Sequence, residues 1–326
     1  MGRARKQRGD AGHLRLGATA LDTRLTALLR EAAGVRQAAD PEPLHQVRVA
    51  SRRLRAAAAL FAPDWPRAWR PAWNRELRRL TRALGRARDL DVQIAFLSSR
   101  LAEPETEPAQ RPGLERLRLR LEQRRERRQR RVVAALDRFA GDTASAMRDF
   151  LAEAGASADT PAPAPTAATF AIARAALAAR IESLLAISDC VSSADAAARH
   201  HEMRIVAKRL RYTLEILAPL DAETLRPALR AAKRLQELLG EMHDCDVWTA
   251  DLPRFLERER RRTLTYCGHV ELFAPLKPGL IALREERLQR RAELHAALVR
   301  LWDEQARDGV WAKLADAPRP PREATA

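Results

Sequence analysis

Apolar residues recur at the spacing of an α-helix along almost the entire chain, and strand-like alternation of β-branched residues is absent. The helical pattern stops at two clusters of proline and glycine, residues 103–113 and 155–166. The second cluster, GASADTPAPAPT, has the Ala/Pro composition of a linker. These patterns predict an all-α protein with two helical regions of similar length.

The interruptions divide the chain into five predicted parts. The first helical repeat spans residues 13–154, the linker spans 155–167, and the second helical repeat spans 168–314. The basic N-terminus at 1–12 and the tail at 315–326 lack a continuing apolar pattern and are predicted to be disordered.

Each helical region contains the same two motifs. HQVRVASRRLR at 45–55 aligns with HEMRIVAKRLR at 201–211, which begins 156 residues later. LGRARDLDV at 84–92 aligns with LGEMHDCDV at 239–247, which begins 155 residues later. Two motifs in one order and at nearly one offset indicate a tandem duplication.

The first motif places its basic side chains on one helix face. At about 100° per residue, His45, Arg48, Arg52 and Arg55 form a stripe about 15 Å long, opposite an apolar face that includes Leu54. A charged stripe is more often a solvated face, on which acidic residues three or four positions away relieve the repulsion. We interpret both stripes as lacking such acids, and therefore predict that an external anion balances their charge. The second copy of the stripe is His201, Arg204, Lys208 and Arg211.

The second motif follows another basic segment, which is fully basic only in the first half of the chain. Gly85 and Gly240 are expected to permit close helix packing or a bend. Glu237 and Glu241 replace two arginines in the second half. The remaining residues of the predicted anion-binding set are Arg53, Arg75, Arg79, Arg82, Arg86, Arg209, Lys233 and Arg234.

Four aspartates of the second motif admit three interpretations: catalytic carboxylates, magnesium ligands, or buried ion-pair partners that orient the stripe. Their position beside many arginines favours ion pairs. The basic segment 116–131 either extends the anion surface or is a solvated helix with internal Glu–Arg pairs. The aspartates are Asp89, Asp91, Asp244 and Asp246.

Composition supports an anionic partner. The formal net charge is +16 and the isoelectric point is near 11.1, whereas only 5% of residues are aromatic. Few aromatic side chains favour a polyanion without bases over single-stranded nucleic acid. Three widely spaced cysteines form no zinc motif, and no apolar stretch is long enough for a membrane span or a signal peptide, so we expect a cytoplasmic protein without a metal or other cofactor.

Both pairs of motifs resemble those of the CHAD domain, the conserved histidine α-helical domain, from about Leu14 to about Trp311. The resemblance implies two helical bundles related by a pseudo-twofold axis, forming one domain that binds inorganic polyphosphate, in some members at polyphosphate granules. Many relatives carry an N-terminal triphosphatase domain, for which the short N-terminus here leaves no room. By this resemblance, the residues expected to bind polyphosphate are His45, Arg48, Arg52, Arg55, His201, Arg204, Lys208 and Arg211.

These observations favour a non-catalytic, polyphosphate-binding protein. A non-sequence-specific nucleic-acid binder is the first alternative, because the same charge supports it. A metal-dependent phosphohydrolase that uses the four aspartates is the second, and it ranks lower because carboxylates beside arginines compete poorly for metal.

Overall fold

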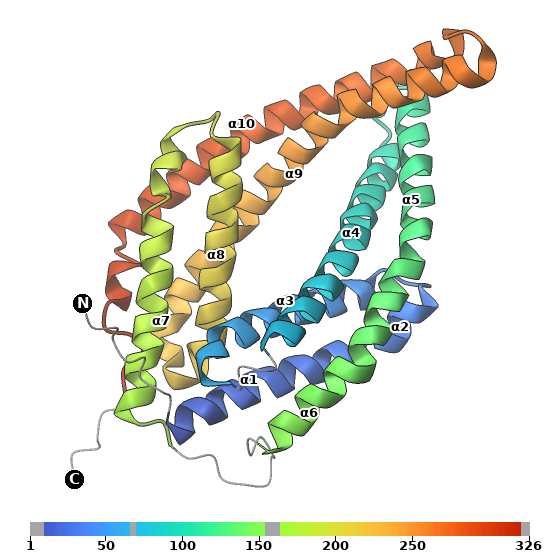
Figure 1. The fold of residues 1–326 in the computed structure, drawn as a ribbon. Helices are drawn as coiled ribbons and strands as arrows, with labels where there is room; N and C mark the ends of the chain where they lie inside the picture. The colour runs from blue at the N-terminus through green and yellow to red at the C-terminus, as the bar shows by residue number, and fades with distance from the viewer. Residues whose placement is uncertain (1–9, 66–69, 154–163, 321–326) are drawn as a thin grey trace, which may run out of the picture.

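The computed structural model describes residues 10–65, 70–153 and 164–320 (Figure 1). All regular structure in these ranges is helical, which confirms the predicted all-α class. The helices of the first half are α1 (Ala11–Arg30), α2 (Ala32–Gln37), α3 (Glu42–Leu60), α4 (Arg70–Ala102), α5 (Arg111–Arg138) and α6 (Ala144–Glu153). Those of the second half are α7 (Ala167–Leu185), α8 (Ala197–Leu217), α9 (Ala222–Cys267) and α10 (Lys277–Arg307).

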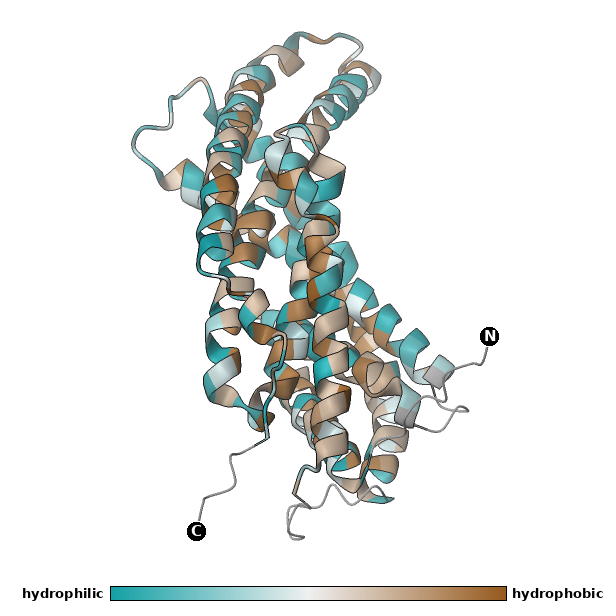
Figure 2. Ribbon diagram, turned by 90° about the vertical axis from the view of Figure 1, so that its left-hand side faces the viewer, coloured by the Kyte–Doolittle hydropathy of each residue, from teal (hydrophilic) through white to brown (hydrophobic). Residues whose placement is uncertain are grey.

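Apolar stripes hold the helices together. Leu54 on α3 and Leu210 on α8, both from the predicted apolar faces, are completely buried. Burying one such leucine contributes about 1.5–3 kcal/mol. One core cluster joins α1 to α6, a second joins α7 to α10, and a third joins α4 and α5 to α9 and α10. Figure 2 shows hydrophobic and hydrophilic residues interleaved along the long helices, as this packing requires.

Both predicted disordered ends are partly packed, which corrects the expected boundaries. Asp10 caps α1 by accepting a hydrogen bond from the His13 backbone N–H at 2.8 Å, and it also accepts one from the Thr169 hydroxyl on α7. Ala317 is 1% exposed within the second core cluster. The Arg319 N–H donates to Asp221, the N-cap residue of α9. Residues 1–9 and 321–326, and the linker positions 154–163, lie outside the described residues.

The N-terminal ends of α5 and α10 cross where the two halves meet, at the top right of Figure 1. A β-carbon added to Gly113 would lie 2.3 Å from the backbone oxygen of Leu276, and one added to Gly279 would lie 2.0 Å from that of Gln110. The two contacts are equivalent under a single shift of 166 residues, so the duplicated halves touch reciprocally at this crossing. Only glycine permits so close an approach of two backbones.

Alanine at this crossing should destabilise the fold. We expect Gly113→Ala to cost about 1–3 kcal/mol, the usual cost of overpacking, because backbone atoms must move apart. Gly141→Ala is the control, since an added β-carbon there has nothing within 4 Å. Urea unfolding measures both, and equal midpoints for the two variants would contradict the account of the crossing.

Candidate anion-binding site

The basic stripes of α3 and α8 meet because these two helices pack against each other across the halves of the chain. The guanidinium carbon of Arg52, from α3, lies 6.0 Å from the ring centroid of Tyr212 on α8. That of Arg211 lies 5.2 Å from the same centroid. Arginines from both repeats therefore share one aromatic ring, which is itself 6% exposed.

A cavity of 270 Å³, called the central cavity below, opens beside this contact and is lined by Arg52 of the first repeat and by Arg204 and Lys208 of the second. None of these three side chains has a carboxylate oxygen within 4 Å among the described residues. The charge is therefore not balanced by close ion pairs, although acids of α9 line the other wall. The remaining lining residues are Gln236, Glu237, Gly240, Glu241 and Asp244.

The pKa of Lys208 is lowered, which reflects this excess of positive charge. Burial, and to a smaller extent the neighbouring arginines, together lower the pKa of its ammonium to about 7. A lysine with this pKa is about half neutral at pH 7, whereas an ordinary lysine is fully charged. The arginines that act on it are Arg52, Arg204, Arg55 and Arg209.

A second cavity, of 380 Å³, lies between the two copies of the second motif. Arg48 and Arg204 line it from the stripes, and Arg48 donates a hydrogen bond to Asp89 at 3.1 Å. Burial raises the pKa of Asp244, whereas Arg204 opposes the shift. Arg287 also lines the cavity, with its guanidinium carbon 4.7 Å from the ring centroid of Phe96.

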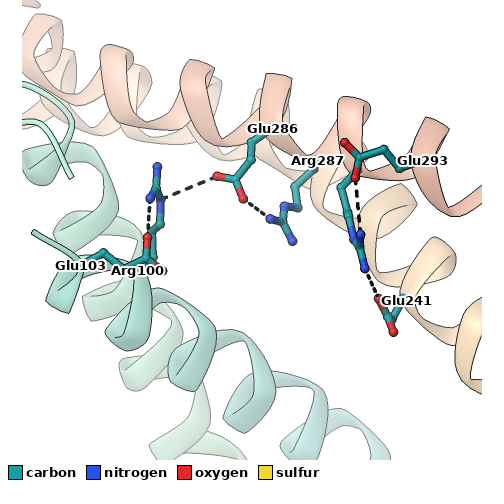
Figure 3. Close-up of polar contacts among 7 residues, drawn as sticks. Arg100, Glu103, Glu241, Glu286, Arg287 and Glu293 are labelled. Carbon is teal, nitrogen blue, oxygen red and sulfur yellow. Dashed lines mark hydrogen bonds and ion pairs between the residues drawn. The ribbon is translucent and has the colours of Figure 1, made fainter. Parts of the chain in front are cut away.

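Ion pairs occupy the α10 wall of this second cavity (Figure 3). Arg290 bonds to Glu241 on α9 at 3.0 Å and to Glu293 at 3.4 Å. Arg287 pairs with Glu286, which also lies 3.6 Å from Arg100 on α4. Positive charge on this wall is balanced within the protein, in contrast to the α3–α8 stripes.

The motif histidines each face the second motif of their own repeat. His201 Nδ1 lies 3.1 Å from Nδ1 of His243, and burial followed by Arg204 lowers the pKa of His243 to about 4. Burial and then Arg88 lower the pKa of His45, whose Nδ1 is buried without a hydrogen-bond partner among the described residues. His45 and His243 are therefore neutral at pH 7, and His45 offers a hydrogen bond rather than a charge.

The two repeats have nearly the same spacing between their motifs, and this spacing has a geometric reason. An added β-carbon at Gly85 would lie 3.9 Å from Nε of Arg48, and one at Gly240 would lie 3.9 Å from Nε of Arg204. In both repeats, the glycine of the second motif thus lies beside the first arginine of the stripe. An added methyl group at this distance would be in ordinary van der Waals contact, so the close packing expected at these two glycines is not found.

A family model described as the CHAD domain matches residues 19–253. The chain belongs to the CHAD-domain family. A crystal structure of the CHAD domain from the plant Ricinus communis is similar at 26% sequence identity, with a TM-score of 0.61 over 98% of this chain and 97% of that one. PptA from Streptomyces chartreusis shares the fold at 18% identity and a TM-score of 0.60, over 90% of this chain and 99% of that one. No curated protein matches the sequence, and no triphosphatase domain is detected in it.

Several predicted site residues of this CHAD domain are engaged by acids. Glu215 bonds to Arg53 at 2.9 Å and lies 3.3 Å from Arg211, four residues earlier on α8. The expectation that the stripe lacks acids at helical spacing is therefore wrong at its C-terminal end. The other engaged residues are Arg75 and Arg79 with Glu76, Lys233 with Glu237, and Arg234 with Glu304.

The aspartates of the CHAD motifs divide into two kinds. Asp91 accepts a hydrogen bond from Arg125 on α5 at 2.5 Å, and Asp246 accepts one from Arg291 on α10 at 2.8 Å. These equivalent pairs tie the second motif to the next helix rather than to the stripe, which corrects the expected role. Within the part of the chain that the structure describes, Asp89 is the only one of the four that pairs with a stripe arginine, and its side chain is 66% exposed.

Sequence reasoning missed Arg287 and Arg290, because α10 carries no repeated motif and its arginines alternate with glutamates. Among the described residues, no three His, Cys, Asp or Glu side chains lie together in a group that could hold a metal ion. Across the same ranges, no helix combines the length and the apolar character needed to cross a bilayer.

Proposed function

We propose that this CHAD domain binds inorganic polyphosphate through the α3–α8 stripes, which both repeats contribute. The CHAD family is linked to polyphosphate. The observation that carries the proposal is the group Arg52, Arg204 and Lys208, which line one cavity and have no carboxylate of a described residue within 4 Å. A linear polyphosphate carries about one charge per phosphoryl unit, so it matches a row of guanidinium groups without any sequence to read.

The aromatic residues near the stripes argue for polyphosphate over nucleic acid. Proteins that hold single strands stack bases on exposed aromatic rings. Tyr212 is the ring at the centre of the stripes, and it is 6% exposed and covered by Arg52 and Arg211. This ring supports arginines rather than offering a platform for a base.

We further propose that binding is not coupled to hydrolysis. Asp91 and Asp246 are held by Arg125 and Arg291, and Asp89 by Arg48, so these carboxylates serve as ion-pair partners. In the cell, the protein would then act in the cytoplasm and at polyphosphate granules, as a binder of stored phosphate.

One titration tests the function. Long-chain polyphosphate is titrated into the protein at physiological salt, with duplex DNA and RNA of equal total charge as competitors. We expect polyphosphate to displace both nucleic acids, and we expect no phosphate release from the same samples with added Mg²⁺. Equal or tighter binding of DNA would contradict the proposed ligand, and phosphate release that Asp89→Asn abolishes would contradict the non-catalytic role.

A further inference from the structure

A separate pocket of 340 Å³ lies between α4 and α5, within the first repeat. It is lined by six arginines and three alanines, and no acidic residue lines it. All of the arginines except Arg86 lie outside both duplicated motifs. The arginines are Arg79, Arg82 and Arg86 on α4, and Arg128, Arg131 and Arg138 on α5.

Most of this charge is not paired within the protein. Among the described residues, Arg79 is the only arginine of the pocket with a carboxylate within 4 Å, that of Glu76. Elsewhere on α5 the ordinary arrangement occurs, as in the pair of Arg118 with Glu122 four residues later. Like charges three or four residues apart repel each other and destabilise a helix, so the arginines of the pocket reduce the stability of the fold.

The second repeat shows that folding does not require these arginines. Positions on α4 correspond to positions 155 residues later on α9, as in the second motif. Positions on α5 correspond to positions 166 residues later on α10. These positions contain one arginine and three glutamates, and Arg234 bonds there to Glu304 at 3.1 Å. The same pair of helices is thus built with acidic and apolar residues. The six equivalent residues are Arg234, Glu237, Glu241, Leu294, Ala297 and Glu304.

The arginines of the pocket lie close enough to the α3–α8 stripes to influence a stripe arginine electrostatically. Arg82, which lines the pocket, is among the charges that lower the pKa of Arg55, as is Arg52 of the central cavity. Arg55 is therefore near charges of both the central cavity and the pocket. From Arg128 to Arg138 the pocket extends about 15 Å along α5.

We propose that the α4–α5 arginine pocket is a second phosphate-binding site, which receives the polyphosphate chain where it leaves the α3–α8 stripes. This inference rests on the proposed function and adds two properties to it. The bound polyphosphate extends from the stripes toward the first repeat only, because the equivalent surface of the second repeat is acidic. A chain must also exceed a minimum length to engage both sites, whereas a short oligophosphate occupies one.

The test compares long-chain polyphosphate with tripolyphosphate on the double variant Arg128→Ala/Arg131→Ala. We expect the variant to lose at least tenfold in affinity for the long chain and to bind tripolyphosphate within about twofold of wild type at the stripes. Arg127→Ala/Arg130→Ala is the matched control, since it removes the same charge from exposed positions of α5 outside the pocket. Its affinity for the long chain should stay within about twofold of wild type.

Three results would overturn the inference: unchanged affinity of the pocket variant for the long chain, an equal loss in the control, or an equal loss for tripolyphosphate. In each of these results wild-type protein still binds polyphosphate, so the proposed function survives. If wild-type protein binds neither ligand, the proposed function fails, and the inference fails with it. Thermal unfolding midpoints at or above that of wild type would show that the variants remain folded.

Discussion

Replacing Arg48 and Arg52 with alanine should weaken polyphosphate binding by well over tenfold. A hydrogen bond to a charged group contributes about 1.5–3 kcal/mol, and a tenfold change in affinity corresponds to about 1.4 kcal/mol. Arg52 points into the central cavity and Arg48 lies beside it in the second one. Isothermal titration with polyphosphate measures the loss.

The control for this experiment must remove charge without disturbing the fold. Arg120 on α5 is unsuitable, because it bonds to Glu259, whose side chain is 2% exposed. Arg127→Ala/Arg130→Ala removes two exposed charges instead, and it should change the affinity little. Equal losses in the control and in Arg48→Ala/Arg52→Ala would show that binding depends on diffuse charge alone.

Polyphosphate affinity should fall as the pH rises from 7 to 9. In the free protein, burial and neighbouring arginines lower the pKa of Lys208 to about 7. A bound anion favours the charged form, so above pH 7 binding must take up a proton, and the affinity should fall by up to tenfold per pH unit. His45 and His243 have lowered pKa values and titrate below this window.

Two variants isolate the contribution of Lys208. Lys208→Arg keeps the charge at every pH, so the fall in affinity should largely disappear; an unchanged slope would contradict the assignment. Lys208→Met should weaken binding but raise the thermal unfolding midpoint. The sign follows from linkage: the pKa of Lys208 is lower in the folded state than in the unfolded one, so wild-type stability rises with pH from about 7 to about 10. The stabilisation by Lys208→Met should therefore be largest at and below pH 7.

The stripes could be predicted from sequence because helical spacing alone decides which side chains share a face. His45, Arg48 and Arg52 lie three or four residues apart, and the duplicated motif marks their counterparts. The pair of Arg211 with Glu215 was equally local, at four residues, and was nevertheless missed.

The arginine pocket and the ion pairs of α5 depend on which helices pack together, and helical spacing does not encode this. Arg131 joins Arg86 only because α5 packs against α4. Arg120 finds its partner Glu259 139 residues away, so the segment 116–131 gave two interpretations of equal merit. Burial of Ala317 was unpredictable for a similar reason, since a short Ala/Pro segment has no periodicity and packs only against a core already formed.

The most direct test of the central claim is the stoichiometry of binding to a short polyphosphate of defined length, measured by calorimetry. Arg48→Ala/Arg52→Ala removes charge from the first repeat, and Arg204→Ala/Lys208→Ala removes it from the second. If the two stripes form one site, each variant should bind the same number of chains per protein as wild type, with at least tenfold weaker affinity. If each repeat binds its own chain, each variant should bind half as many chains at the wild-type affinity, and a site shared by the repeats would be contradicted.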